Sequence, residues 1–265
     1  MSSTVTKALM LLEHFSEDEP ELGLSDLARR SGVDKAAVHR MLGAMAESGL
    51  VEQQADSRLY RLGAGVLRLA RVRETAFPIN SIVQPVLDAL SVETGETAHA
   101  SLISGRALAN IATCESRKGN RVSLVAGEVL PYHSTASGLA TLAFADDKLI
   151  KRVLAAPREA RTCFTPTDAE EIRTRVDTAR QNGFCESDQT NEEDVHGLAA
   201  PVFDRTAKAC GAVSVSTPSH RMTEAQKQLS IAAVLRAAET ITAGLGGQRP
   251  REYAKLVDRH LTGRD

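Results

Sequence analysis

Residues 24–42 read LSDLARRSGVDKAAVHRML, and this stretch predicts two helices around a glycine turn. We expect Ser25 to cap a short first helix and Gly32 to be the turn residue that ends it. Asp34 is the next N-cap, for a longer helix over residues 35–48. The longer helix buries one apolar face, made of Val38, Met41, Leu42 and Met45. Two helices arranged in this way form a helix-turn-helix unit.

The other face of the longer helix has the composition of a DNA-recognition surface. It carries small and basic residues concentrated in its N-terminal half: Lys35, Ala36, Ala37, His39 and Arg40. Small side chains let a helix enter the major groove, and its first turns supply contacts to bases and phosphates. Ser25 belongs to the same predicted DNA-binding set, and Arg29 and Arg30 add positive charge that can face phosphates. The plainer alternative is a pair of helices that only pack together.

The segments on either side extend this unit. An apolar stripe predicts a preceding helix over residues 3–16. After the longer helix, residues 50–63 form two extended runs around the turn residues 55–57, which predicts a β-hairpin, or wing. Arg58 lies at the tip of the wing, where it can reach the DNA backbone or the minor groove. The hairpin favours DNA binding over simple helix packing.

Bulk properties limit the classes of protein that remain. A length of 265 residues allows two domains, and a net charge of −2 means that any DNA contact must come from a local basic surface. The N-terminus lacks a signal peptide, and no run of about 18 apolar residues is present. The four cysteines lie far apart without a CxxC pair, so we expect reduced thiols, no metal site and no cofactor. These features favour a cytoplasmic protein that does not contact membranes.

The quoted stretch resembles the helix-turn-helix of IclR-family transcription regulators. So does its continuation through Gly49-Leu50-Val51 and Tyr60-Arg61-Leu62-Gly63, and the similarity extends to about residue 243. The resemblance implies a regulator, more often a repressor than an activator, that binds a double-stranded DNA operator as a homodimer or a dimer of dimers. It also implies a small-molecule effector bound by a GAF-like C-terminal domain.

Four parts of the chain follow from this. We expect a winged helix-turn-helix over residues 1–63, a linker over 64–78, an effector-binding domain over 79–245 and a C-terminal extension over 246–265. The linker contains a predicted helix, Gly65–Phe77, whose apolar residues have no core of their own and are expected to pack against a second copy. A plain spacer helix is the alternative.

The larger domain mixes helices and strands, which predicts an α+β fold with a central antiparallel sheet. Strands are expected over residues 97–103, 107–113, 121–125, 197–203 and 210–216. Helices are expected over residues 79–94, 135–144, 147–155, 168–182 with Thr167 as its cap, 224–244 and, in the extension, 251–261.

The best candidate for a ligand site is Leu130–Gly138, where a strand end meets a helix start. Ser134 or Thr135 can cap the helix and leave backbone N–H groups free, and such a helix start attracts anions. A carboxylate-bearing effector, a small organic acid, is the simplest inference, although capping alone is the alternative. The segment matches the stretch through which the family contributes to its effector pocket, which adds Ala136 and Ser137.

The resemblance adds a strand of serines and two departures from the family. Ser214 and Ser216 share one face of the predicted strand and match family residues that point at the ligand. Many relatives carry paired acidic residues where this chain has Ser187 and Asp188, so only Asp188 remains acidic. Where many relatives have cysteine, this chain has Gly197, which we expect to widen the pocket. A larger acid, such as a sugar acid or an aromatic acid, is the resulting hypothesis.

Three other interpretations are weighed against this one. An enzyme would need a triad such as Ser134, His133 and Asp188, but adjacent residues rarely place a hydroxyl and an imidazole for mutual hydrogen bonding. A redox-sensing regulator would use its cysteines, with Cys185 as the candidate. His99 we expect to be a hydrogen-bonded member of the sheet and not a ligand-binding residue.

Overall fold

The computed structural model describes residues 3–16, 18–76, 79–125 and 127–262. Two compact units divide the chain, Met1–Pro78 (unit 1) and Ile79–Asp265 (unit 2), and each is treated by itself. The predicted ends of the linker at Phe77 and Pro78, and of the C-terminal extension at residues 263–265, lie outside the described residues. Across the described ranges, no helix combines the length and the apolar character that crossing a membrane requires.

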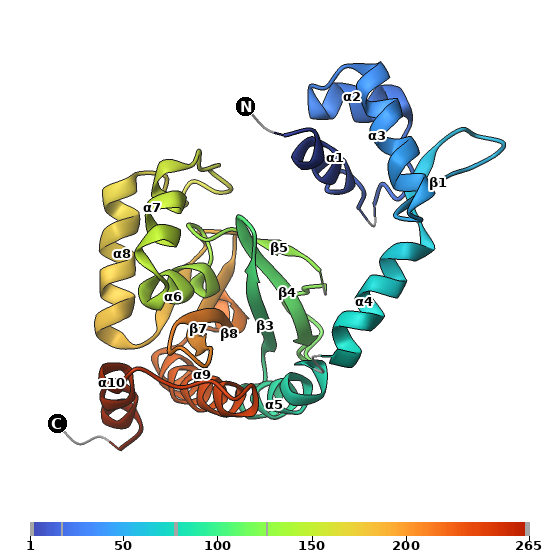
Figure 1. Ribbon diagram of the computed structural model, residues 1–265. Helices are drawn as coiled ribbons and strands as arrows, with labels where there is room; N and C mark the ends of the chain where they lie inside the picture. The colour runs from blue at the N-terminus through green and yellow to red at the C-terminus, as the bar shows by residue number, and fades with distance from the viewer. Residues whose placement is uncertain (1–2, 17, 77–78, 126, 263–265) are drawn as a thin grey trace. The chain divides into compact units, whose positions relative to one another are not determined.

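Unit 1 is a small helical core with a short hairpin (Figure 1). Its elements are α1 (Thr4–Leu12), α2 (Leu24–Ser31), α3 (Lys35–Glu47), β1 (Val51–Gln53), β2 (Tyr60–Leu62) and α4 (Ala64–Ala76). The predicted buried face of α3 packs against α1 and α2, with Leu11, Leu27 and Leu42 fully buried. The predicted helix-turn-helix and hairpin are therefore both present, because each is encoded by local caps and turns.

The ends of the helices in unit 1 follow most of the sequence signals. The carboxylate of Asp34 accepts hydrogen bonds from the N–H groups of Ala36 (2.9 Å) and Ala37 (3.1 Å), so the predicted cap of α3 is confirmed. Gly32 ends α2 with a φ of +66°, as predicted. The prediction for Ser25 is wrong, because α2 begins at Leu24, two residues earlier than predicted, and Gly23 stands at its N-cap without a side-chain bond. The first helix is also shorter than predicted and ends at Leu12.

Three glycines join the end of α3, the wing and the start of α4. The N–H of Gly65 donates to the carbonyl of Gly49 (2.8 Å), and the N–H of Gly63 donates to the carbonyl of Leu50 (2.9 Å). A Cβ atom at position 65 would lie 2.6 Å from the Gly49 carbonyl oxygen, and one at position 63 would lie closer still. The backbones can approach this closely only because these positions lack side chains.

Unit 2 contains a curled six-stranded antiparallel sheet in the order β5-β4-β3-β8-β7-β6. The strands are β3 (Thr97–Ser104), β4 (Ala107–Cys114), β5 (Val129–Leu130), β6 (Cys185–Asp188), β7 (Val195–Phe203) and β8 (Ala209–Pro218). The helices are α5 (Ile79–Thr94), α6 (Ala136–Phe144), α7 (Asp147–Ala155), α8 (Ala169–Asn182), the 3-10 turn Ser219–Arg221, α9 (Glu224–Gly244) and α10 (Arg251–Thr262). The predicted α+β class with a central antiparallel sheet is confirmed.

The two faces of this sheet differ in polarity, and helices cover both of them (Figure 1). One face is apolar, with Val213, Val215 and Leu198 packed against α5 and α9. The other face carries small and polar side chains and is covered by α6, with α8 packed behind it. Because side chains alternate along a strand, both faces come from the same three central strands, β3, β8 and β7.

Some secondary-structure predictions for unit 2 are wrong, and one of them concerns a segment held by side-chain hydrogen bonds. Residues 121–125 do not form the predicted strand, because side chains of the sheet bind the backbone of this segment instead. Thr97 Oγ1 donates to the Val122 carbonyl (2.6 Å), and Asn110 Nδ2 donates to the Val125 carbonyl (2.8 Å). The short edge strand β6 was not predicted, and of β5 the sequence indicated only a strand end at Leu130. At α8, Asp168 and not Thr167 is the N-cap.

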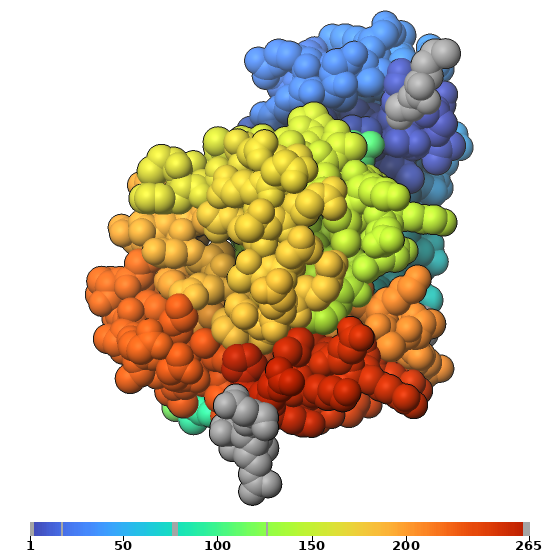
Figure 2. Space-filling view, turned by 90° about the vertical axis from the view of Figure 1, so that its left-hand side faces the viewer, coloured from blue at the N-terminus to red at the C-terminus, as the bar shows by residue number. Residues whose placement is uncertain are grey.

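The C-terminal helix α10 packs on unit 2, a placement that the sequence alone does not decide. Tyr253 and Val257 are 1% exposed, and the ring of Tyr253 lies edge-on to Phe144 and Phe203. His260 Nε2 hydrogen-bonds the Asn182 carbonyl at the end of α8 (2.9 Å). Figure 2 shows α10, in red, against α8, in gold. The extension beyond residue 246 therefore adds to the core of unit 2.

Candidate nucleic-acid interface and effector cavity

The outward face of α3 is open to solvent within unit 1. Lys35, Ala36, His39 and Arg40 are exposed, and Ala37 is half-buried. Ser25, which does not cap α2, instead accepts a hydrogen bond from Lys35 Nζ (2.8 Å). The structure thus places Ser25 beside the start of α3, on the same surface.

The basic residues around α3 fall into two groups. Arg29 pairs with Asp26 (2.7 Å), and Arg30 makes a two-pronged pair with Glu19 (2.6 and 2.7 Å). Arg29 and Arg30 are both exposed, and each has an acidic neighbour that offsets its charge. The second group consists of predicted DNA-binding side chains that form no ion pair with any described residue. They are Lys35, Arg40 and Arg58.

The wing places Arg58 at its turn. Gln53 pairs with Tyr60, and the loop between them contains Arg58 in the left-handed region, with a φ of +60°. Gln53 Nε2 donates to the Arg58 carbonyl (2.8 Å), which holds the backbone of the tip. The side chain of Arg58 is exposed.

Unit 2 contains a cavity of about 50 Å³ between the polar face of the sheet and the start of α6. Seven of the predicted effector-binding residues line it: Thr135, Ala136, Ser137, Ser187, Gly197, Ser214 and Ser216. They come from α6 and from strands β6, β7 and β8, which pair side by side. The sheet register explains this convergence, because Gly197 lies opposite both Ser187 and Ser216.

The start of α6 leaves donors available at the cavity. Thr135 Oγ1 accepts a hydrogen bond from the Gly138 N–H (3.0 Å) and donates to the Pro131 carbonyl (2.7 Å). The N–H groups of Ala136 and Ser137 have no acceptor in the part of the chain that the structure describes. An oxygen of a ligand can occupy such a position, since the first N–H groups of a helix lack partners within it.

Two predicted residues do not line the cavity. Ser134 is fully buried and donates to the side-chain carbonyl of Asn191 (2.9 Å), so it ties the loop before α6 to residue 191. Asp188 points to the other side of the sheet from Ser187, because neighbours on a strand alternate. Its side chain is 58% exposed and accepts from Ser219 Oγ (3.2 Å). No carboxylate from β6 enters the cavity.

Gly197 leaves little open space at its own position in the pocket wall. A Cβ atom at position 197 would lie 2.9 Å from Ser187 Oγ and 3.3 Å from the Cβ of Ala136. The space that a side chain would fill is therefore already taken by neighbouring atoms. The hypothesis of a larger acid loses the volume on which it depends.

Ser214 is less available than its position indicates. Its hydroxyl donates to the Leu198 carbonyl on the neighbouring strand (2.9 Å). Ser216 of β8 and Ser137 of α6 also line the cavity, and both are buried. The cavity is thus lined by hydroxyl groups, of which some already have backbone partners.

His99 is the main residue that sequence reasoning placed elsewhere. It lies opposite Ser214 in the sheet, is 4% exposed and lines the cavity. Its Nε2 lies 3.4 Å from Ser137 Oγ, whereas its Nδ1 has no hydrogen-bond partner. Burial lowers the pKa of His99 to about 4, so the ring is neutral at pH 7. The two-residue spacing of Thr97 and His99 indicates that both lie on one face of the strand. Only the pairing of β3 with β8 shows that this face borders the cavity.

The remaining lining residues come from the end of β5, the start of β7 and the loops beside them. They are Val122, Leu124, Glu128, Leu130, Asn191, Glu192 and Val195. The segment that carries Val122 is held by a buried carboxylate, because Glu96, 1% exposed, pairs with Lys118 (2.7 Å) and Arg221 (2.6 Å). Apart from Leu130, which opens the predicted ligand segment, sequence reasoning missed these residues, since they reach the cavity only through tertiary contacts.

The arrangements needed for the two rival functions are not formed. His133 hydrogen-bonds the Glu159 carbonyl (3.0 Å), Ser134 bonds Asn191 and Asp188 bonds Ser219, so the three do not form a triad. Burial raises the pKa of the Cys185 thiol to about 12, which makes it a poor thiolate sensor. In the described ranges no three His, Cys, Asp or Glu side chains are grouped to hold a metal ion.

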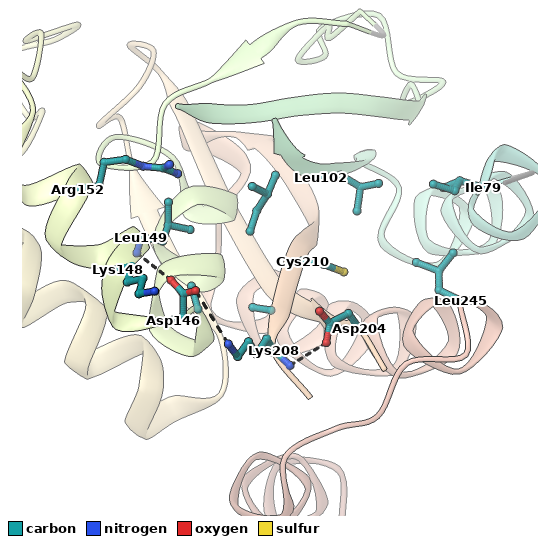
Figure 3. Close-up of a pocket in the computed structure, with 13 residues that line it drawn as sticks. Ile79, Leu102, Asp146, Lys148, Leu149, Arg152, Asp204, Lys208, Cys210 and Leu245 are labelled. Atoms are coloured by element: carbon teal, nitrogen blue, oxygen red, sulfur yellow. Dashed lines mark hydrogen bonds and ion pairs between the residues drawn. The ribbon is translucent and has the colours of Figure 1, made fainter. Parts of the chain in front are cut away.

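A second, wider cleft of about 740 Å³ lies at the other end of β3 and β8 (Figure 3). Its floor includes Leu102, Leu149 and Cys210, and its rim carries charges that are partly balanced. Lys208 Nζ lies 4.0 Å from Asp146, and Arg152 donates to the Gly105 carbonyl (3.0 Å). None of the predicted effector residues lines this cleft.

Comparisons with known proteins agree on one family. Residues 4–55 match the IclR helix-turn-helix domain, and residues 74–243 match the family described as bacterial transcriptional regulator IclR C-terminal. The chain is 30% identical over 246 residues to the HTH-type transcriptional regulator KdgR of Dickeya chrysanthemi, covering 92% of this chain and 80% of that protein. It is 26% identical over 249 residues to the transcriptional repressor IclR of Escherichia coli K12, covering 93% and 91%.

Solved structures show the same architecture. An IclR transcriptional regulator from Silicibacter sp. TM1040 is 43% identical, with a TM-score of 0.88 over 94% of this chain and 99% of that one. An IclR homologue from Microbacterium hydrocarbonoxydans, complexed with 4-hydroxybenzoate, is 23% identical, with a TM-score of 0.73 over 92% and 99%. The second likeness shows the fold alone.

Proposed function

Because this chain belongs to the IclR family of bacterial transcriptional regulators, we propose that it represses transcription by binding a double-stranded DNA operator under the control of a small organic acid. In this proposal the operator contacts α3 and the wing, and the acid binds in the cavity at the start of α6. The relatives named above are regulators, which argues against an enzymatic role.

One observation carries the DNA-binding part of the proposal: the outward face of α3 is exposed and holds its basic side chains without acidic partners. Lys35 and Arg40 can approach phosphates, while Ala36 and Ala37 leave room for the helix to enter the groove. Ser25 and His39 lie on the same surface, and Arg58 extends the contact from the wing. Each unpaired cation that meets a phosphate releases a counterion, which makes the affinity depend on salt.

The effector part rests on the cavity. Free N–H groups at the start of α6 and the hydroxyls of Ser137, Ser187 and Ser216 suit a carboxylate without requiring a buried cation. A relative of this fold binds 4-hydroxybenzoate, itself an acid. The cavity of about 50 Å³ is well below the roughly 300–1,000 Å³ of typical drug-sized sites, so we propose a compact acid.

Exposed apolar side chains support assembly from two or four copies. On α4, Leu67 is 74% exposed and Val72 is 60% exposed, and on α1 Val5 is 68% exposed. Apolar side chains that recur on exposed helices mark interaction surfaces. We propose that a second copy covers them, which light scattering after size-exclusion chromatography would test.

DNA binding can be tested with the region upstream of the protein's own coding sequence, using fluorescence anisotropy over a range of salt concentrations. We expect Lys35→Ala and Arg40→Ala each to weaken binding, and each to reduce the salt slope by about 1. The control is Arg173→Ala, which removes an exposed arginine from α8 in unit 2. If both α3 variants bind as tightly as the control, the operator does not contact this face.

A further inference from the structure

The charges around the effector cavity are one-sided. Its lining includes two carboxylates, Glu128 and Glu192, and no lysine or arginine among the residues that the structure describes. Glu128 is half-buried and accepts a long hydrogen bond from the Val125 N–H (3.4 Å). Glu192 is exposed at the rim. A site built for a doubly charged acid would have the opposite sign.

The nearest cation in the hydrogen-bond network does not change this balance. Arg161 donates to the backbone carbonyl of Asn191 (3.2 Å), but it is exposed and does not line the cavity. The histidine on the wall, His99, is neutral at pH 7 for the reason given above. A single carboxylate of the effector can be held by N–H groups and hydroxyls, whereas a second one would face Glu128 and Glu192.

A buried atom without a partner also points to a ligand. His99 is only 4% exposed, and its Nδ1 makes no hydrogen bond to any described residue. Leaving such an atom unpaired costs free energy, and the cavity is where a ligand group can meet the imidazole. The wall therefore provides a neutral imidazole as well as hydroxyls, and it suits a ligand with several hydrogen-bonding groups.

We propose that the effector is a monocarboxylic acid that carries a hydroxyl or ammonium donor away from its carboxylate, and that Glu128 and Glu192 bind this donor. The carboxylate is held at the start of α6, and dicarboxylic acids are rejected by repulsion from the two glutamates. This inference rests on the proposed function, because it assigns the chemistry of the same cavity.

Four acids of equal chain length test the proposal: butyrate, 4-hydroxybutyrate, 4-aminobutyrate and succinate. They share a four-carbon chain and differ only at the carbon remote from one carboxylate, which is a methyl, a hydroxymethyl, an ammoniomethyl or a second carboxylate. Isothermal titration of the full-length protein is the measurement. We expect at least one of the two donor acids to bind about tenfold or more tighter than butyrate, and succinate to bind most weakly. The two donor acids also distinguish a hydroxyl from an ammonium.

Variants assign the preference to the two carboxylates. Glu128→Gln and Glu192→Gln keep the shape of the side chains and remove one negative charge each, so both should reduce the preference for the donor acid and improve succinate binding. Glu193→Gln is the matched control, because Glu193 is exposed next to Glu192 but does not line the cavity. Thermal melting of each variant shows whether it is folded.

The outcomes separate this inference from the proposed function. If butyrate or succinate binds as tightly as both donor acids, the inference fails while an acid site remains. If the preference survives in both glutamine variants, the two glutamates do not bind the donor and the inference also fails. If none of the four acids binds, the inference and the acid-binding part of the proposed function fail together.

Discussion

Helices α3 and α6 begin in similar ways and face different surroundings. Each starts after a polar cap, Asp34 or Thr135, whose oxygen accepts hydrogen bonds from N–H groups of the first turn. The first turns of α3 are exposed and carry unpaired cations, whereas Ala136 and Ser137 of α6 are buried and neutral. A charged side chain keeps its hydration at the surface, whereas burying it costs desolvation free energy. An exposed anion site therefore uses lysine and arginine, and a buried one uses backbone dipoles and hydroxyls.

The largest expected difference between the two helices comes from a glycine in α6. In Gly138→Ala the new Cβ would lie 2.7 Å from the Pro131 carbonyl oxygen and closer still to that of Tyr132. These are backbone atoms that must shift, so we expect unit 2 to lose at least about 3 kcal/mol of unfolding free energy. Urea unfolding combined with hydrogen exchange resolved by peptide measures the loss. Wild-type protection in peptides of unit 2 would show that α6 does not begin in such close contact.

The buried histidine beside α6 predicts a pH dependence for unit 2. The pKa of His99 is about 4 in the folded protein because of burial, against an ordinary value of 6.5. The unfolded chain therefore binds the proton more tightly, and stability is retained above pH 6.5 and lost as the pH falls towards 4, by roughly 3 kcal/mol at most.

The measurement is urea unfolding at several pH values in wild type and in His99→Gln, which removes the titrating ring. His39→Gln in α3 is the control, since it keeps the buried histidine. The loss between pH 6.5 and 4 should be smaller in His99→Gln alone. Carboxylates such as Glu186, whose pKa is lowered from 4.5 to about 2 by its hydrogen bond to His196, contribute their loss from about pH 4.5 downward. Equal losses in all three proteins would contradict the assignment.

The two caps should differ in their contribution to stability. Thr135→Ala leaves the Gly138 N–H and the Pro131 carbonyl without a partner in a buried place, so we expect a loss of about 2 kcal/mol. In Asp34→Ala the N–H groups of Ala36 and Ala37 can bond water instead, so we expect a loss of about 1 kcal/mol of unfolding free energy. Thr135→Ser keeps the hydroxyl and is the control for α6. Chemical unfolding of the three variants measures the free energy of unfolding. A larger loss in Asp34→Ala than in Thr135→Ala would contradict the prediction.

The smallest expected effect comes from Gly43→Ala in α3, which corresponds to Gly138→Ala in α6. Gly43 lies inside the helix, and a Cβ atom there would have no heavy atom within 4 Å. We expect Gly43→Ala to stabilise unit 1 by about 0.5–1 kcal/mol, because alanine loses less backbone freedom on folding. Thermal melting monitored by circular dichroism would detect the gain. A destabilised variant would mean that some group packs against this side of α3.

How far the sequence alone can predict the structure differs between these helices. The cap of α3 and its exposed basic face follow from neighbours within a few residues, so local signals were sufficient. The miss at Ser25 is small and also local, since the serine lies one residue inside the helix that it was expected to cap. The charge balance at Arg30 was missed because Glu19 lies in another segment.

The cavity in unit 2 depends on sheet register, which local signals do not contain. Ser187 and Asp188 are adjacent, and only the pairing of Ser187 with Gly197 decides which of them faces the ligand site. His99 enters the site because β3 pairs with β8, far away in sequence. The alternating residues 121–125 have the pattern of a strand, but side chains of the sheet bind their backbone.

The glycine crossing in unit 1 has a mechanical consequence. The carbonyl of Gly49 accepts from Gly65, and no side chain separates the backbone that leaves α3 from the backbone that enters α4. Because the Gly65 N–H is bonded directly to the Gly49 carbonyl, we expect a rotation at the start of α4 to be transmitted to the end of α3. Larger residues at 63 or 65 would disrupt this contact, because a Cβ atom there would lie against the Gly49 carbonyl oxygen.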